Sequence, residues 1–208
     1  GGPGAGRAAA FRGPLRAGGD FAFEVKARNT VPTAAGFASS ASGFAALAKA
    51  ADGLFGWGLE TKELSILARL GSGSAARSLA DGFVEWHAGT AADGMDSFAE
   101  RLEAEWPQLR VGAVVLCAEE KPVGSRAGMK RSVETCEFYR EWPRRVARDL
   151  AALKAAIAER DFEVLGTVAE DNALAMHALM LATRPPILYA LPETVAAIRK
   201  IWAAREAG

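Results

Sequence analysis

Two stretches of small residues constrain the fold of this chain more than any other feature, because each leads directly into a helix pattern. The first covers residues 32–44, whose glycine, alanine and serine side chains let backbone N–H groups approach a neighbouring group closely. At a helix start those N–H groups point outward and suit a phosphate. Close packing against another element is the alternative. The stretch has neither the Gly-Lys-Ser/Thr of a P-loop nor the spacing of a dinucleotide-binding fingerprint.

The second stretch, residues 71–78, reads Gly-Ser-Gly-Ser-Ala-Ala-Arg-Ser and adds a fixed positive charge. A loop followed by the first turn of a helix could turn Ser72, Ser74 and Arg77 toward one ligand. Two hydroxyls and a guanidinium group together suit a carboxylate or a phosphate. Equally, one serine could cap the helix while Arg77 lies on the surface as an ordinary solvated charge.

A third candidate is the basic segment that begins at Ser125 and Arg126 and continues to Lys130 and Arg131. We expect it to follow a strand and a loop, a position that favours anion binding, although most basic clusters are solvated faces. His177 lies six residues after Asp171 on a predicted helix. That spacing does not place the two on one face, so His177 is not assigned as a base.

Composition excludes several classes of function. The chain has 25 basic and 25 acidic residues, so its balanced charge favours neither a nucleic-acid partner nor an anionic membrane. The two cysteines and two histidines are scattered without zinc-ligand spacing, and we expect Cys117 to be a buried strand residue. Neither a run of about 18 apolar residues nor a signal-peptide pattern occurs, so a cytoplasmic location is expected.

The order of patterns along the chain predicts an α+β protein with two parts, residues 1–106 and 107–208. The boundary is placed at the composition break around Trp106 and Pro107. Alternation predicts strands over residues 21–29 and 82–87, and the apolar run 107–117 predicts a third. Helices are expected from about residue 41 to 51, over 61–70, from about 75, and over 142–160, 161–183 and 192–207. The Arg184-Pro-Pro sequence is expected to end the second-last of these.

Several segments together resemble the mevalonate diphosphate decarboxylase family of the GHMP kinase superfamily. They agree in order and spacing over residues 29–189, and the Gly-Ser-Gly-Ser-Ala-x-Arg-Ser element is the most specific. The matching segments are residues 29–47, 68–79, 82–86, 128–136, 171–178 and 185–189. The resemblance implies a two-lobed α+β GHMP-kinase-type fold with its site in the cleft between the lobes.

The resemblance also implies an activity. Members phosphorylate the 3-hydroxyl of mevalonate 5-diphosphate with ATP and Mg²⁺, then lose that phosphate and carbon dioxide to give isopentenyl diphosphate. It implies a cytoplasmic homodimer of the mevalonate pathway, a carboxy-lyase. No metal ligand is assigned.

Matching positions take the roles of the family's residues. Arg77 is the catalytic residue that holds the substrate carboxylate, with Ser72 and Ser74 beside it, and Ser125 and Arg126 hold the diphosphate. The positions expected to bind the ATP phosphates are Pro32, Ala35, Gly36, Ser39 and Ser40.

The chain also departs from the family pattern. The family has an N-terminal segment with a lysine, a tyrosine and a tryptophan, and a catalytic aspartate in an Asp-Ala-Gly-Pro-Asn motif. Neither is found here, and many relatives have serine at the position of Cys136. We therefore expect a fold incomplete at both ends and a chain that is inactive alone. A mevalonate phosphate decarboxylase, a mevalonate kinase-like enzyme or a non-catalytic homologue is the alternative.

Overall fold

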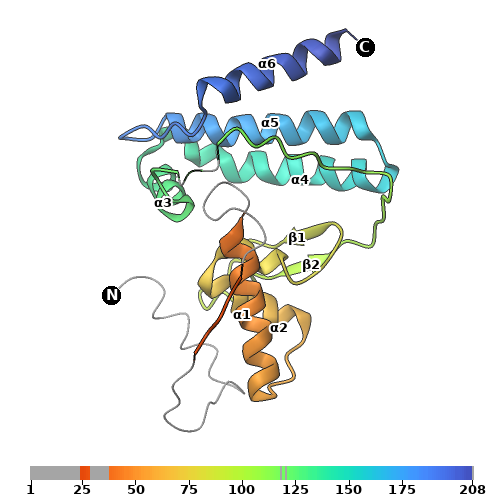
Figure 1. The fold of residues 1–208 in the computed structure, drawn as a ribbon, viewed down its shortest axis with the longest axis vertical. Coiled ribbons are helices and arrows are strands. Elements are labelled where there is room, and N and C mark those ends of the chain that lie inside the picture. Colours follow the sequence, from red (N-terminus) through yellow and green to blue (C-terminus); the bar gives the residue numbers. More distant parts are fainter. Residues whose placement is uncertain (1–23, 29–37, 118, 120, 208) are drawn as a thin grey trace. The chain divides into compact units, whose positions relative to one another are not determined.

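The computed structural model describes residues 24–28, 38–117, 119 and 121–207 (Figure 1). The chain divides into two compact units, of which the first ends at Glu105 and the second begins at Trp106. The first unit combines helices with a small sheet, and in the second the only regular elements among the described residues are helices.

The first unit holds two α-helices, a 3₁₀ helix and a two-stranded sheet. In chain order these are α1 (Ser39–Phe55), α2 (Thr61–Gly71), η1 (Gly73–Arg77), β1 (Val84–Trp86) and β2 (Ala99–Arg101). The strands are antiparallel, with Val84 opposite Arg101 and Trp86 opposite Ala99. A capping box at Glu60 and Glu63 begins α2.

Small side chains form the core of this unit and allow its helices to approach closely. Gly71 illustrates the closeness, because a β-carbon built there would lie 2.0 Å from Cδ1 of Phe44 on α1. Ala41 of the first stretch and Gly71 of the second therefore serve packing, which was the alternative interpretation given for the first stretch. The core comprises Ala41, Ala48, Ala68 and Ala75, with Leu67 and Leu79 packed against it.

One buried hydroxyl connects three elements of this unit. The side chain of Ser65 on α2 is fully buried. Its Oγ donates to the carbonyl of Ala76 in η1 at 3.1 Å and accepts from the N–H of Ala99 in β2 at 2.8 Å. Ser65 thereby fixes η1 relative to both α2 and the sheet.

Replacing Ser65 with alanine should lower the free energy of unfolding by about 2 kcal/mol. Two buried backbone groups lose their partner, and a buried polar group left unsatisfied costs roughly 1–3 kcal/mol. Urea denaturation measures the change, with the exposed Ser42→Ala on α1 as the control. An equal effect of the two substitutions would contradict the bridging role of Ser65.

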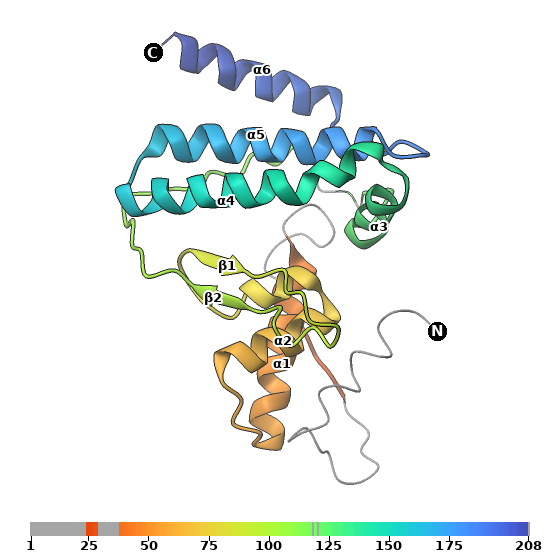
Figure 2. The same cartoon turned by 180° about the vertical axis from the view of Figure 1, so that it is seen from behind.

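The second unit is built on a pair of long helices that lie side by side in both views (Figures 1 and 2). Its elements are α3 (Ser125–Thr135), the 3₁₀ helix η2 (Glu137–Glu141), α4 (Trp142–Glu159), α5 (Phe162–Leu181) and α6 (Pro192–Glu206). Helix α4 has proline in its first turn, where the missing N–H costs nothing. The side chain of Asp161 accepts from the N–H of Val164 at 3.0 Å and caps α5.

A carboxylate on α5 holds α6. Glu170 accepts from the indole Nε1 of Trp202 and from the guanidinium group of Arg205. No residue of α6 is buried, and these two polar contacts with Glu170 link α6 to α5. Among the described residues, no helix combines the length and apolarity needed to cross a bilayer.

The helices expected from sequence are confirmed with small shifts of their ends. Helix α1 begins at Ser39 and runs to Phe55, beyond the expected end near residue 51. The helix expected from about residue 75 is instead the 3₁₀ helix η1, which begins at Gly73. The strand expected over residues 82–87 is confirmed as β1, and its partner β2 was not predicted.

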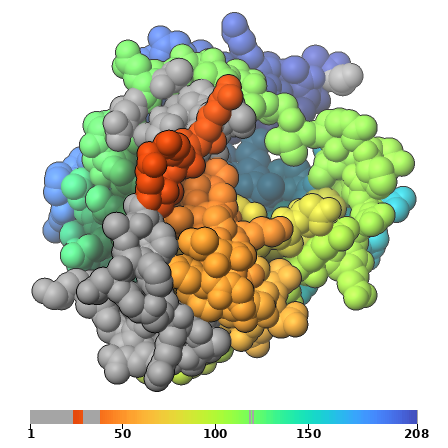
Figure 3. Space-filling model, turned by 60° about the horizontal axis from the view of Figure 1, so that its bottom comes forward, coloured from red at the N-terminus to blue at the C-terminus, as the bar shows by residue number. Residues whose placement is uncertain are grey.

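Within the ranges that the structure describes, two predicted strands are not found. Residues 107–117 contain no strand and have no β-ladder partner among the described residues, and the side chains of Val111 and Val114 are 91% and 70% exposed. Cys117, expected to be buried, is exposed. Of the strand predicted over 21–29, the described residues 24–28 form no strand. They are exposed, as the red segment in Figure 3 shows.

Candidate functional site

The first candidate segment lies at the start of α1. Ser39 and Ser40 are the first two helical residues, and Ala38 before them has the left-handed φ of 52°. A non-glycine residue in that region is strained, and such strain occurs at functional sites. Pro32, Ala35 and Gly36, the other residues expected to bind ATP phosphates, lie outside the described residues.

The structure brings the first candidate segment into contact with the second. Ser40 Oγ of α1 and Ser72 Oγ lie 3.4 Å apart, within hydrogen-bonding distance. Ser72 occupies the junction of two helices, because its N–H donates to Ala68 at the end of α2 and its carbonyl accepts from Ala75 in η1. Two hydroxyl groups that are 32 positions apart in the sequence thus lie next to each other in the first unit.

The 3₁₀ helix η1 positions Ser74 and Arg77 relative to each other. A 3₁₀ helix has three residues per turn, so residues three apart lie on the same side. Ser74 and Arg77 therefore share one side of η1, while Ala75 and Ala76 are buried in the core. Arg77 is exposed, and Ser74 is half-buried. An α-helix, as expected from the sequence, would have placed these two side chains less directly in line.

Trp86 of β1 is a neighbour that the role assignment from sequence missed. The Arg77 guanidinium group lies over its ring, 5.8 Å from the centroid, at a distance where cations are attracted to aromatic faces. A β-carbon added at Gly73 would lie 2.9 Å from the same ring. Trp86 is the last residue of the segment 82–86 that resembles the family, and this resemblance is the sequence signal that could have identified it.

The third candidate segment begins α3 in the second unit. Ser125 is the first residue of the helix and Arg126 the second, and both are exposed. Lys121 Nζ donates to Ser125 Oγ at 2.7 Å. Lys121 was not among the predicted residues, because it lies in a loop where four-residue spacing carries no structural information.

The remaining members of this segment have structural contacts. Lys130 pairs with Glu134 at 3.7 Å, and Arg131 donates to the carbonyl of Pro185 at 3.4 Å. His177 lies edge-on to the Tyr189 ring with 6.4 Å between centroids, which fits the structural role expected from its spacing. Asp171 contributes its backbone carbonyl, which accepts from Arg145 at 3.0 Å.

The groups with clearly shifted pKa values are three carboxyl groups and a phenol, and none of them is a predicted site residue. A hydrogen bond from Asn172 and the charges of Arg148 and Arg145 hold the pKa of Asp149 below its usual value. Contacts with Arg205 and Trp202 lower the pKa of Glu170.

The other two shifted groups are Asp96 and Tyr189. Backbone N–H groups, that of Thr90 foremost, lower the pKa of Asp96, and burial raises the pKa of Tyr189. These carboxylates serve structure.

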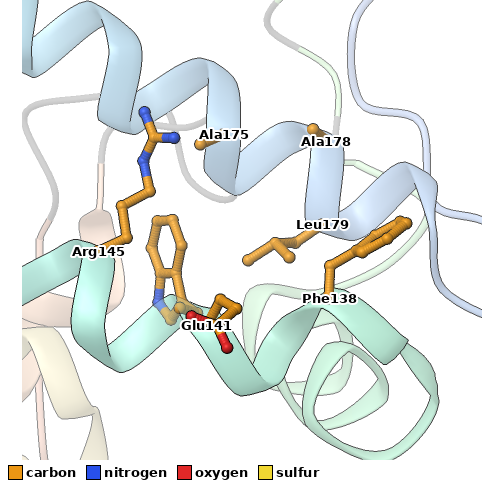
Figure 4. Close-up of a pocket in the computed structure, with 7 residues that line it drawn as sticks. Phe138, Glu141, Arg145, Ala175, Ala178 and Leu179 are labelled. Atoms are coloured by element: carbon orange, nitrogen blue, oxygen red, sulfur yellow. The ribbon is translucent and has the colours of Figure 1, made fainter.

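A cavity of about 250 Å³ lies within the second unit, between α5 and the segment that joins η2 to α4 (Figure 4). Figure 4 shows Leu179 and Ala178 of α5 facing Phe138 and Glu141 across it. Its lining residues are Phe138, Glu141, Trp142, Arg145, Ala175, Ala178 and Leu179, none of which is a predicted site residue. Within the described ranges no group of three or more His, Cys, Asp and Glu side chains could hold a metal ion.

Two family models match the chain in succession. Residues 10–99 match the diphosphomevalonate decarboxylase-like N-terminal domain, and residues 112–204 match the mevalonate 5-diphosphate decarboxylase C-terminal domain. Among curated relatives, diphosphomevalonate decarboxylase of Bos taurus is 42% identical over 179 residues, covering 85% of this chain and 44% of the relative. The Homo sapiens enzyme is 44% identical over 164 residues, covering 77% and 40%.

Solved structures give the same result. The mevalonate diphosphate decarboxylase of Staphylococcus aureus superposes with a TM-score of 0.75 at 42% identity, covering 86% of this chain and 54% of that one. The enzyme of Enterococcus faecalis gives 0.73 at 42% identity, with the same two coverages. A structure described as MDDEF in complex with MVAPP, AMPPCP and magnesium gives 0.76 at 42% identity, also covering 86% and 54%.

These likenesses first define a class: the chain has the α+β fold of GHMP-kinase-type enzymes. Identity above 40% and successive matches to both domain models then narrow the class. The chain belongs to the diphosphomevalonate decarboxylase family. It spans about half the length of the relatives it matches, 44% of the bovine enzyme and 54% of the staphylococcal one.

Proposed function

We propose that this chain serves ATP-dependent decarboxylation of mevalonate 5-diphosphate to isopentenyl diphosphate. In this reaction ATP phosphorylates the 3-hydroxyl of the substrate. The bond between C3 and that oxygen then breaks, the carboxylate leaves as carbon dioxide, and its bonding electrons form the new double bond. ADP and inorganic phosphate are the other products. Membership of the decarboxylase family and the contact between Ser40 and Ser72 support the proposal.

The contact between Ser40 and Ser72 carries the argument from this chain's own structure. In the proposal Ser40 belongs to the ATP segment and Ser72 to the segment for the substrate carboxylate. The transferred phosphoryl group must reach a hydroxyl on the carbon atom next but one to the carboxylate. The two segments must therefore lie within a few ångströms of each other, and their hydroxyls are 3.4 Å apart.

In the proposed site the substrate carboxylate is held by Arg77, Ser72 and Ser74. The planar guanidinium group matches the two carboxylate oxygens and fixes the plane in which carbon dioxide departs. Ser74 shares the accessible side of η1 with Arg77, so its hydroxyl can donate to the same anion. Trp86 beneath Arg77 restricts the guanidinium group and lowers the entropy lost on binding.

Ser125 and Arg126 bind the substrate diphosphate in this proposal, and Lys121 adds a second cation. The ammonium group of Lys121 is 2.7 Å from Ser125 Oγ, at the N-terminus of α3. Hydroxyl, ammonium and helix N-terminus all favour a phosphate group.

ATP would be held through Ser39 and Ser40 at the start of α1, together with Pro32, Ala35 and Gly36. The fit is favourable, because the first N–H groups of a helix suit phosphate oxygens. Magnesium, when bound, neutralises phosphate charge during transfer. Mg²⁺ usually keeps several waters and is bound through nucleotide phosphates and one or two carboxylates, and no residue of this chain is assigned as its ligand.

The experiment compares two ligands that differ by one phosphate. Titration calorimetry on the 208-residue chain should show mevalonate 5-diphosphate binding at least about tenfold more tightly than mevalonate 5-phosphate, because one charged contact with Ser125 or Arg126 contributes roughly 1.5–3 kcal/mol. Protein expressed from the whole coding sequence around this chain should release labelled carbon dioxide only when ATP is present. Equal affinity for the two ligands would contradict the diphosphate assignment. Absence of both binding and carbon dioxide release would contradict the function.

A cytoplasmic homodimer is part of the proposal. Free cysteines at positions 117 and 136 accord with a reducing compartment. Sedimentation velocity would test the dimer, and a monomer at micromolar concentration would contradict it.

A further inference from the structure

Tyr189 connects the segment after α5 to the loop that precedes α3. Its hydroxyl donates to the backbone carbonyl of Val123 at 2.8 Å, across 66 positions of sequence. Burial raises the pKa of this phenol, so the group remains a protonated donor through the physiological range. The Tyr189 side chain thus fixes the position of the loop backbone at Val123, two residues before α3 begins.

The same ring also contacts Lys121. The Lys121 ammonium group lies 5.5 Å from the Tyr189 centroid and 2.7 Å from Ser125 Oγ. A flexible lysine stem has several accessible rotamers, and simultaneous contact with a ring and a hydroxyl group selects among them. Tyr189 therefore acts on the position of Lys121 both through the ring and through the loop backbone.

Helix α3 approaches the Tyr189 hydroxyl group closely at Gly128. A β-carbon at Gly128 would lie 2.8 Å from the Tyr189 hydroxyl oxygen and 3.7 Å from Ile187 Cδ1. Gly128 is buried, so the close approach of α3 to Tyr189 depends on the missing side chain. The hydroxyl is therefore enclosed between the loop carbonyl and the helix.

We propose that Tyr189 is a positioning residue, which holds Lys121 and the first turn of α3 in the arrangement that receives a diphosphate. The inference rests on the proposed function for the identity of the ligand. The arrangement itself is present without ligand, so positioning and binding can be measured separately.

Positioning is measured by the chemical reactivity of Lys121. Limited acetylation followed by mass spectrometry should show Lys121 reacting at least about threefold faster in Tyr189→Leu, relative to the exposed Lys200 in the same chain. Tyr189→Phe keeps the ring and should give an intermediate rate. Tyr139→Phe, a change in the other tyrosine of the chain, should leave the rate unaltered. An unchanged Lys121 rate in both Tyr189 variants would overturn the proposal.

Binding is measured with inorganic pyrophosphate as the probe. Affinity should fall about threefold in Tyr189→Phe, the cost of one hydrogen bond, and about tenfold in Tyr189→Leu. In a Lys121→Met background the leucine substitution should cost clearly less, because part of its effect passes through Lys121. A loss of equal size in both backgrounds would show that Tyr189 acts only on the fold and would refute the positioning role.

The two measurements separate this inference from the function on which it rests. If the unmodified chain does not bind pyrophosphate, the diphosphate site of the proposed function is wrong, while the acetylation rates still decide whether Tyr189 positions Lys121. If Tyr189→Leu does not fold, as circular dichroism would reveal, Tyr189→Phe decides both measurements.

Discussion

In protein expressed from the whole coding sequence, replacing Arg77 with glutamine should slow decarboxylation by about a hundredfold or more, an effect typical of removing a charged group that stabilises the reacting anion. Glutamine keeps a hydrogen-bond donor but loses the charge and the bidentate geometry. Affinity for ATP should stay within about twofold, because the nucleotide segment at Ser39 and Ser40 belongs to a different helix. Steady-state release of labelled carbon dioxide and calorimetry with an ATP analogue measure the two quantities.

Two further variants test the interpretation of Arg77. Arg101→Gln removes an arginine from β2 in the same unit, where it pairs with Asp81 and Glu105, and should leave turnover nearly unchanged. Arg77→Lys keeps the charge without the planar fork and should recover only part of the rate. Near-normal turnover in Arg77→Gln would remove Arg77 from the carboxylate role.

Replacing Asp149 with asparagine should destabilise the second unit by roughly 2–3 kcal/mol. The buried carboxylate accepts from Asn172 at 2.9 Å and from Arg148 at 2.7 Å, with Arg145 at 3.3 Å. Removing one partner of a fully buried ion pair costs about 3–5 kcal/mol, and exposure of Arg148 reduces the cost here. Thermal unfolding should shift downward by roughly 10 °C.

Asp171→Asn is the matched control, because this carboxylate lies exposed on the neighbouring helix. Its effect should be within about 0.5 kcal/mol, as for most surface substitutions. If the two variants have equal unfolding midpoints, the contacts of Asp149 do not stabilise the unit.

The same carboxylate makes stability depend on pH in the acid range. Contacts lower the pKa of Asp149 in the folded state, so the unfolded chain binds the proton more readily. Its contribution is therefore fully present above the unfolded value of about 4 and is lost as pH falls through the folded pKa. The stability difference between the native chain and Asp149→Asn should narrow as pH decreases below about 4, and urea titrations at several pH values would measure it.

Most of the helices could be predicted because each carries its own local signals, whereas α3 was not predicted. The apolar spacing along α4, the cap at Asp161 and the prolines after Arg184 all act within a few residues of the helices that they define. Strands depend on partners elsewhere in the chain. The run 107–117 has a strand's composition, yet no described segment pairs with it, so its apolar side chains remain exposed.

The candidate site was predictable in its residue types and less so in its contacts. Hydroxyls and arginine near helix starts marked Ser72, Ser74 and Arg77, but spacing alone could not reveal that Ser40 meets Ser72. Lys121 was missed because it lies in a loop, where sequence spacing does not reveal its contact with Ser125. The glycines at positions 71 and 73 also have a packing role beside the candidate serines. Gly71 makes room for Phe44, and Gly73 makes room for a tryptophan.

That tryptophan, Trp86, has a practical consequence. Its indole lies against Gly73 and beneath the Arg77 guanidinium group, so a positive charge stands over the ring. An anion that draws Arg77 away, or neutralises it in place, changes the electric field across the indole. The intrinsic fluorescence of Trp86 is therefore an optical reporter, built into the fold, of what arrives at the candidate carboxylate site.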